Sequence, residues 1–189
     1  GDRAKNLMID YGFPKNTLQS VYNSLDYREH KELRRKVIDD SVMDAFFEFP
    51  DRPVLFFIGR LTESKKLNLM IEAVSILHEN GTDCNLLIIG DGELKDNLVE
   101  LANSLLPSNS YYFYGASYDA KETGRLIANS DLCVSPGNVG LTAIHSFRFG
   151  TPVFTHCNFS SQGPEYEAIT ESQTGFFFRE NDVRDLATK

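Results

Sequence analysis

Several kinds of sequence signal are missing from this chain of 189 residues, and each absence removes a class of protein. No apolar run approaches the roughly 18 to 20 residues that a membrane-spanning helix needs, and the first ten residues lack the apolar stretch of a secretion signal. Acidic residues outnumber basic ones by 27 to 19, and the net charge of −8 argues against broad electrostatic binding of nucleic acid or anionic lipid. We therefore expect a soluble, cytoplasmic protein without a transmembrane segment.

Metal-binding and nucleophile motifs are also lacking. The cysteines, Cys84, Cys133 and Cys157, form no CxxC pair, so we expect each to be a buried small hydrophobic residue in a reducing compartment. The four histidines have no ligand-like spacing, and there is no GxSxG, HExxH or GK[ST] motif. Asp91 and Glu93 could be interpreted as a pair of metal ligands. Their position at a helix start is adequately explained if they cap the helix and interact with its dipole. We expect no metal site and no cofactor.

The chain instead alternates short apolar runs with segments of helical period. With 41% hydrophobic and 12% aromatic residues, its composition is typical of a soluble globular domain. The runs are mostly continuously apolar, as in strands that are buried on both faces of a parallel sheet. They are Val54–Ile58, Asn85–Ile89, Tyr111–Tyr114, Leu132–Ser135, Pro152–His156 and Thr174–Phe178. This alternation predicts a doubly wound, mostly parallel, Rossmann-like α/β sheet.

Local signals place the helices between these strands. Ser64 is expected to cap the first, Asp91 or Gly92 the second, and Asp119 with Glu122 forms a capping-box-like start for the third. An amphipathic segment within 27–47 precedes the first strand, and Pro50 follows it. We expect residues 1–50 to be a linker with this leading helix, and 51–189 to be the Rossmann-like unit, the whole forming one compact domain.

Ligands of such sheets bind outside the carboxyl ends of the strands, so the strand-to-helix turns carry the most information. These turns are 59–66, 90–93, 115–119, 136–142 and 157–165. In the first, Gly59 allows a tight exit from the strand, and Arg60 and Lys65 then flank a helix N-terminus. Two cations and a helix dipole can hold a diphosphate. The alternative is that Arg60 pairs with a carboxylate and the lysines are solvated.

The fourth turn, SPGNVGLTAIH, is a glycine-bearing loop that enters a helix. Backbone N–H groups near Gly140, Leu141 and Thr142 are natural phosphate donors there. The alternative is an ordinary turn, with His145 packed inside the helix. The second turn, GDGE, resembles the start of a dinucleotide fingerprint, but Lys95 stands where the third glycine should be, which argues against a nicotinamide cofactor.

Taken in order, five phrases resemble the C-terminal, nucleotide-sugar-binding half of the group 1 (family 4) glycosyltransferases, which have the two-domain GT-B architecture. They are FIGRLTESKKLNLMIEA at 57–73, LLIIGDGELKDNL at 86–98, YFYGAS at 112–117, ANSDLCVSPGNVGLTAIHSFRFGTPVF at 128–154 and TGFFF near 174–178. VYNSLD at 21–26 resembles the interdomain linker, so the resemblance runs from roughly residue 17 to the end. It implies that the N-terminal acceptor-binding domain is missing from this chain.

The resemblance also implies roles for individual residues. Arg60 and Lys65 match the cations that neutralise the donor diphosphate and stabilise its departure, although Lys66 replaces the usual glycine. Leu141 and Thr142 match positions whose amides touch the phosphates, and we expect Gly59 and Gly140 to belong to the same diphosphate site. The loop that meets the nucleobase contains Tyr114, Ala116 and Ser117. A metal-independent reaction that retains anomeric configuration is implied.

Two departures from the family pattern concern the sugar and the ribose. The family carries two glutamates eight residues apart, and the matching positions are Gly137 and His145. No Glu occurs between Glu122 and Glu165, so a small shift of the alignment restores neither. An imidazole accepts one hydrogen bond and cannot replace a carboxylate that accepts from two hydroxyls. We therefore expect His145, Gly137 and the adjacent Asn138 to meet the ribose or sugar differently.

The resemblance predicts the donor-binding domain of a glycosyltransferase that uses a nucleoside-diphosphate sugar in polysaccharide or glycoconjugate biosynthesis. This chain alone is expected to be inactive, because the acceptor would bind to the missing domain, through which peripheral membrane contact also remains open. A non-catalytic nucleotide-sugar-binding module and a sugar-nucleotide epimerase of the same architecture are the alternatives. We expect the acidic surplus to lie away from a small cationic pocket at Arg60 and Lys65.

Overall fold

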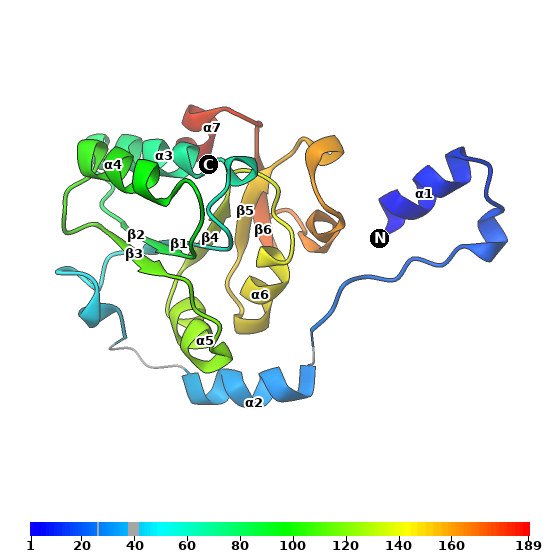
Figure 1. Cartoon of the computed structure of the whole chain (residues 1–189), viewed down its shortest axis with the longest axis horizontal. Helices are drawn as coiled ribbons and strands as arrows, with labels where there is room; N and C mark the ends of the chain where they lie inside the picture. The colour runs from blue at the N-terminus through cyan, green and yellow to red at the C-terminus, as the bar shows by residue number, and fades with distance from the viewer. Residues whose placement is uncertain (26, 38–41) are drawn as a thin grey trace.

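A computed structural model describes residues 1–25, 27–37 and 42–189. Six parallel strands form one sheet in the order β3-β2-β1-β4-β5-β6 (Figure 1). They are β1 (Val54–Ile58), β2 (Asn85–Ile89), β3 (Tyr111–Gly115), β4 (Leu132–Ser135), β5 (Val153–His156) and β6 (Gly175–Phe178). The strand order reverses direction between β1 and β4, as in a doubly wound sheet. The predicted fold class is confirmed.

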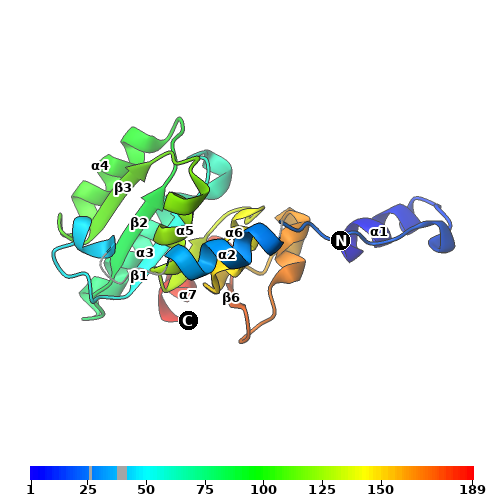
Figure 2. The same ribbon diagram turned by 90° about the horizontal axis from the view of Figure 1, so that it is seen from below.

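Helices cover both faces of the sheet (Figures 1 and 2). On one face lie α3 (Leu67–Glu79), α4 (Lys95–Leu105) and α7 (Val183–Thr188), over a core that includes Phe57, Met70 and Leu86. The other face is covered by α5 (Ala120–Ala128) and α6 (Thr142–Phe149), over a core that includes Phe56 and Ile127, and α2 (Tyr27–Val37) packs against these two helices. The central strands are thus buried on both sides, which explains their continuously apolar sequence.

The predicted strands agree closely with the observed ones. The ranges of β1, β2 and β4 are the predicted ranges, β3 is one residue longer, and β5 and β6 each begin one residue later. The starts of α3 and α4 were predicted wrongly. Lys66 and Leu94 precede these helices without a side-chain cap, while Ser64 lies in the short 3-10 helix η3 (Glu63–Lys65).

The predicted cap of α5 is confirmed in part. The Asp119 carboxylate accepts the N–H groups of Lys121 and Glu122. The Glu122 carboxylate does not return to the Asp119 amide, as it would in a capping box, but accepts the hydroxyls of Tyr114 and Ser117. Glu122 is therefore a link between α5 and the turn after β3.

The segment before the sheet contains more structure than expected. The helix α1 (Asp2–Asp10) and the 3-10 helix η1 (Lys15–Thr17) precede α2, and another 3-10 helix, η2 (Val42–Ala45), follows α2. Part of the predicted amphipathic segment, 38–41, lies outside the described residues. Val37, Met43 and Phe47 in the described part of that segment are buried, as the pattern predicts.

The helix α1 stands away from the main body and contacts it through its first residues (Figures 1 and 2). It contacts the 3-10 helix η5 (Pro164–Ala168), which follows the 3-10 helix η4 (Phe159–Ser161) after β5. The Glu167 carboxylate accepts the amides of Asp2 and Arg3, and the Arg3 guanidinium donates to the carbonyl of Ser160. These polar contacts hold a helix that has no buried residue.

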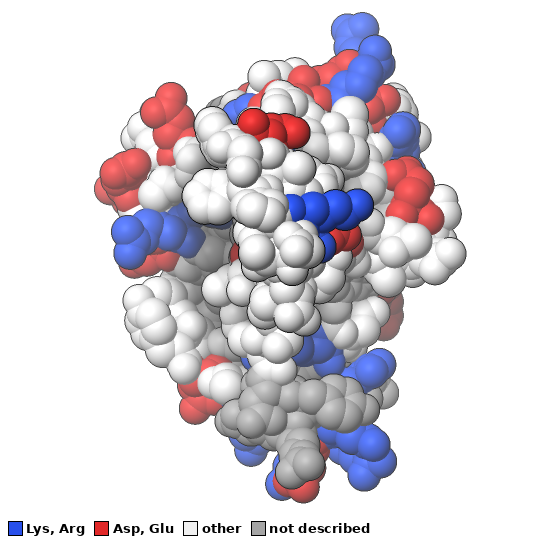
Figure 3. Space-filling model, turned by 90° about the vertical axis from the view of Figure 1, so that its right-hand side faces the viewer, with Lys and Arg blue, Asp and Glu red and all other residues white. Residues whose placement is uncertain are grey.

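Surface features complete the description. Cys84 and Cys133 are buried, but Cys157 is exposed at the end of β5, so its predicted burial was wrong. Within the described residues, no helix is long and apolar enough to cross a membrane, and no three His, Cys, Asp or Glu side chains are grouped as metal ligands would be. On the face where α1 lies, acidic and basic side chains are interspersed (Figure 3), so the acidic surplus forms no single-sign patch there.

Candidate functional site

Two adjoining clefts lie at the carboxyl edge of the sheet, where the strand order reverses between β1 and β4. The larger cleft has a volume of about 440 Å³ and the smaller about 270 Å³. They share Ile58, Gly59, Arg60, Ser117 and Tyr118. Lys65, Leu141, Thr142, His145 and Arg148 also line the larger cleft, and Gly90, Asp91 and Ala116 line the smaller one. A ligand of nucleotide size fits a space of this order.

Glycines allow the first two turns to pack against each other. Gly59 and Gly90 both have a φ of +153°, and a Cβ on Gly90 would lie 1.9 Å from the carbonyl oxygen of Gly59. A Cβ on Gly92 would lie 2.4 Å from the oxygen of Leu61. The GDGE sequence that resembles a dinucleotide fingerprint is therefore explained by backbone contact between two turns.

Lys65 is held across the site. Its ammonium donates to the carbonyl oxygen of Asn138 at 2.6 Å, and the amides of Gly137 and Asn138 donate to the carbonyls of Lys65 and Ser64 at 3.0 and 3.2 Å. Burial lowers the pKa of the Lys65 ammonium, and the Glu165 carboxylate opposes this shift. The first and fourth turns are thus joined directly beside the larger cleft.

Arg60 has a different environment. Its side chain is exposed and lines both clefts, and it makes no ion pair with the described residues. The predicted alternative, in which Arg60 pairs with a carboxylate and the lysines are solvated, does not describe this arrangement. Of Arg60, Lys65 and Lys66, only Lys66 forms an ion pair with a described residue, Glu180, at 2.7 Å. Arg60 is therefore available to an anion in the cleft.

The start of α6 provides amide donors at the same place. Gly140 has a φ of +50°, and the Thr142 hydroxyl donates to the carbonyl of Ile58 at 2.8 Å, which fixes the helix start against β1. No acceptor from the described residues contacts the amides of Leu141 and Thr142. These N–H groups, at the positive end of the helix dipole, can donate to phosphate oxygens.

His145 lines the larger cleft one turn into α6. Burial lowers the pKa of its imidazole, which favours the neutral ring, and Nδ1 lies 3.4 Å from a guanidinium nitrogen of Arg148. The neutral ring has one donor and one acceptor nitrogen. His145 is therefore partly buried in α6 and also lines the cleft, so the two interpretations of this residue do not exclude each other.

The structure does not bring every predicted site residue into the clefts. Ala116 and Ser117 line them, but Tyr114 turns away, with its ring 5.6 Å from that of Phe46 and its hydroxyl on Glu122. Burial is the main cause that raises the pKa of Tyr114 to about 12. Gly137, Asn138 and Gly140 support the wall without lining the clefts.

Gln162 is a structural part of the site that sequence reasoning missed. Its side-chain Nε2 donates to the Thr155 hydroxyl at 2.8 Å, and its side-chain Oε1 accepts a hydrogen bond from the Val139 backbone amide at 2.9 Å. Gln162 is buried and joins the turn after β5 to the turn after β4. The only available signal was its position in the fifth strand-to-helix turn.

One known protein family matches most of this chain. The family model of glycosyl transferases group 1 matches residues 40–189. The chain belongs to this family. The resemblance to group 1 glycosyltransferases, on which the expected fold was based, is confirmed.

Relatives of this glycosyltransferase chain are considerably longer than it is. The glycogen synthase of Francisella philomiragia is 30% identical over 148 residues, which are 72% of this chain and 29% of that protein. A glycosyltransferase from Rickettsia africae superposes with a TM-score of 0.75 at 19% identity, over 97% of this chain and 48% of that one. Anabaena HepE in complex with UDP gives 0.70 at 18% identity, over 99% and 50%. The chain spans about half of these solved chains and less than a third of the synthase.

Proposed function

We propose that this chain binds the nucleoside-diphosphate sugar in an enzyme that transfers the sugar to an acceptor, in the synthesis of a polysaccharide or glycoconjugate. The main observation behind this proposal is that one cleft is lined by Arg60, Lys65, Leu141 and Thr142. The backbone amides of Leu141 and Thr142 have no acceptor among the described residues. The names of two similar proteins support the proposal, since one is a glycogen synthase and the other was crystallised with UDP.

The proposed mechanism is electrostatic. When the bond from the sugar to the diphosphate breaks, negative charge develops on the β-phosphate. The ammonium of Lys65, the guanidinium of Arg60 and the two amides would stabilise this charge more in the transition state than in the bound substrate. Because Lys65 is already fixed by Asn138, little reorganisation accompanies the reaction.

We further propose that the transfer needs no metal or cofactor. Arg60 and Lys65 flank the diphosphate position, where a divalent cation would otherwise neutralise charge. Full activity of the whole enzyme after dialysis against EDTA is the expected result. A loss that Mg²⁺ or Mn²⁺ restores would contradict this part of the proposal.

The partners and location are proposed on similar grounds. A second domain would bind the acceptor, since the matched solved chains are about twice as long as this one. We place the protein in the cytoplasm, because its three cysteines are free thiols, which suits a reducing compartment.

Calorimetry with UDP, GDP and ADP and with their monophosphates tests the binding site. We expect one diphosphate to bind at least about tenfold more tightly than its monophosphate. Arg60→Ala and Lys65→Ala should each remove most of that difference. Arg184→Ala, which removes an exposed cation on α7, is the matched control and should not change it. Equal binding of diphosphate and monophosphate would refute the proposal.

A second candidate is a non-catalytic nucleotide-sugar-binding module. It is favoured by Gly137 and His145, which stand where the family has glutamates. Such a protein, at full length, would bind the donor with the same diphosphate preference but transfer no sugar to any acceptor. Turnover by the full-length protein therefore separates the two functions.

A further inference from the structure

The place of the missing sugar-side carboxylate is closed by the backbone. A Cβ on Gly137 would lie 2.0 Å from the carbonyl oxygen of Ser64 and 2.8 Å from the Cα of Lys65. Since real Cβ atoms do not approach backbone this closely, no side chain fits at residue 137 in this arrangement. If a carboxylate binds the sugar hydroxyls, it must therefore belong to a residue other than residue 137.

Glu165, on η5, is brought to the same loop by the turn after β5. A Cβ on Gly163 would meet both a carboxylate oxygen of Glu165 at 2.8 Å and the side-chain oxygen of Asn138 at 3.3 Å. Gly163 therefore leaves room for Glu165 to fold back toward Asn138, the residue after Gly137. Glu165 is half-buried and lines a separate cavity with Asn23 and Ile144, the latter on α6, the helix whose His145 lines the larger cleft.

The charge of Glu165 acts on Lys65, which lines the larger cleft. These two described side chains form no ion pair, however, so they lie more than hydrogen-bond distance apart. Lys65 donates to Asn138 instead. A carboxylate near the lysine proposed to bind the diphosphate, but not paired with it, keeps its capacity to accept hydrogen bonds from sugar hydroxyls.

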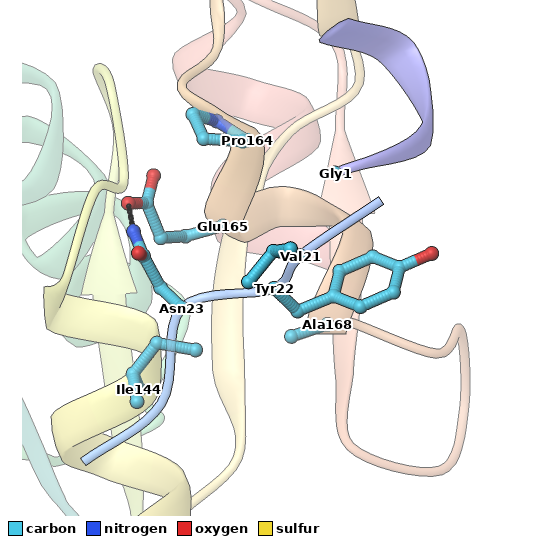
Figure 4. A pocket seen from close by; sticks show the side chains of 8 residues that line it. All are labelled: Gly1, Val21, Tyr22, Asn23, Ile144, Pro164, Glu165 and Ala168. Atoms are coloured by element: carbon cyan, nitrogen blue, oxygen red, sulfur yellow. Dashed lines mark hydrogen bonds between the residues drawn. The ribbon is translucent and has the colours of Figure 1, made fainter. Parts of the chain in front are cut away.

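The linker holds the other side of this carboxylate. The side-chain amide of Asn23 donates to Oε1 of Glu165 at 2.7 Å, and Figure 4 shows the two side chains facing each other, with Ile144 of α6 below them. Asn23 lies in the extended segment before α2, far from Glu165 in sequence. One oxygen of Glu165 is thus anchored, and the other remains on the side of Asn138 and Gly163.

We propose that Glu165 binds hydroxyl groups of the transferred sugar, in the role that a residue at position 137 cannot fill, and that Asn23 is its positioning residue. This inference rests on the proposed function, because it assigns the sugar part of the same donor site. It makes Glu165 a determinant of which sugar is accepted, separate from the cations that hold the diphosphate.

The test compares each nucleotide with its sugar derivative by calorimetry on this chain, using UDP with UDP-glucose and GDP with GDP-mannose. For the pair that the wild type binds, Glu165→Gln should lower the affinity for the sugar nucleotide about tenfold and leave the affinity for the free diphosphate within about twofold. Asn23→Ala should give a smaller loss of the same kind. The isosteric Gln avoids a change in volume, and unchanged melting temperatures show that both variants fold.

Glu167→Gln is the matched control, since it removes a carboxylate from the same short helix that contacts only α1 amides. It should change neither affinity. If Glu165→Gln weakens diphosphate and sugar nucleotide equally, or neither, the inference is wrong. If Arg60→Ala and Lys65→Ala leave diphosphate binding intact, the proposed function fails instead, so the two failures are distinct.

Discussion

Lys65 and Arg60 are five residues apart and line the same cleft, but their surroundings differ. Lys65 is half-buried, and its ammonium is fixed on the Asn138 carbonyl. Arg60 is exposed and must lose rotamer freedom when an anion binds. Lys65 is thus the preorganised cation of the pair, and Arg60 the adaptable one.

The lowered pKa of Lys65 predicts an alkaline limit to diphosphate binding. Burial moves this pKa below the ordinary value of 10.5, so the ammonium loses its proton at a lower pH than an exposed lysine would. Affinity for the diphosphate should therefore fall as pH rises toward 10.5. In Lys65→Arg the guanidinium stays charged, and calorimetry from pH 7 to 10 should show a flatter profile. Parallel profiles for the two proteins would contradict the assignment.

Gly137 predicts a steric effect at a single residue. Gly137→Ala should destabilise the fold by roughly 1–3 kcal/mol, because its Cβ would collide with the Ser64 carbonyl and push the two turns apart. Gly137→Glu introduces the residue that the family has at this position. It should destabilise the fold at least as much as Gly137→Ala and should also weaken diphosphate binding. Urea unfolding measures the first effect and calorimetry the second.

Gly81→Ala serves as the comparison for these variants. Gly81 has a φ of +79° but faces open space, so its substitution should cost only about 1–2 kcal/mol of left-handed backbone strain. Diphosphate affinity should not change in this control. An improvement in stability or donor binding by Gly137→Glu would show that the turns can separate easily, which the close contact does not predict.

Individual site residues differed in how far the sequence could predict them. Arg60 and Lys65 follow from charge spacing in one turn, and the amides of Leu141 follow from a glycine loop that enters a helix. The positions of Tyr114 and Glu165 depend on which neighbour each side chain meets. Phe46 lies before the sheet and Asn23 before α2, so local sequence could not supply either contact.

At the scale of elements, the start of α3 shows how the fold positions the site. Lys66 adopts a φ of +50° and ψ of 39° between η3 and α3, a left-handed conformation that favours glycine. This explains why glycine is usual at the matching family position. Here the Lys66 ammonium reaches Glu180 and Asn181, at 2.7 and 2.9 Å, and these contacts offset part of the backbone cost.

The Lys66–Glu180 pair predicts a pH-dependent stability difference. The hydrogen bond from Lys66 is the main cause that lowers the pKa of Glu180 to about 2, below its ordinary 4.5. The stabilisation is therefore fully present above about pH 4.5 and is lost as pH falls toward 2. Glu180→Gln should cost under about 1 kcal/mol at pH 7, since the pair is partly exposed. Urea unfolding at pH 7 and pH 3 should show a smaller difference at pH 3; equal differences would contradict it.

Most elements were predictable because their signals are local. Continuous apolar runs define β1, β2 and β4, since buried parallel strands admit little else. The starts of α3 and α4 could not be predicted, because tertiary contacts determine them. At the start of α4, for example, the Leu94 amide donates to the carbonyl of Leu61 in the neighbouring turn. The helix α1 carries no buried residue, so its sequence shows no core-facing stripe.

The whole molecule consists of a sheet unit and an N-terminal segment that reaches back across it. The extended residues 18–25 pass η5 and α6 before α2 begins, while α1 lies beyond them (Figures 1 and 2). The candidate cleft opens at the carboxyl edge of the sheet and contains the groups that we propose to bind the diphosphate.

This organisation predicts binding without turnover. The isolated chain should bind the diphosphate and its sugar derivative but release no nucleotide through transfer to an acceptor, because the second domain is proposed to bring the acceptor. A coupled assay for released UDP or GDP, with the full-length protein as positive control, measures this. Sugar transfer by the isolated chain would show that the acceptor site lies within these 189 residues.

The hydrogen bond between Asn23 and Glu165 has a thermodynamic consequence for the segment that carries Asn23. If the bond strengthens when a sugar engages Glu165, then any force that displaces residues 18–25 weakens sugar binding by the same factor, because such linkage is reciprocal. Sugar binding and the position of residues 18–25 would then be thermodynamically coupled. The coupling would pass through the side-chain amide of Asn23 and the carboxylate of Glu165.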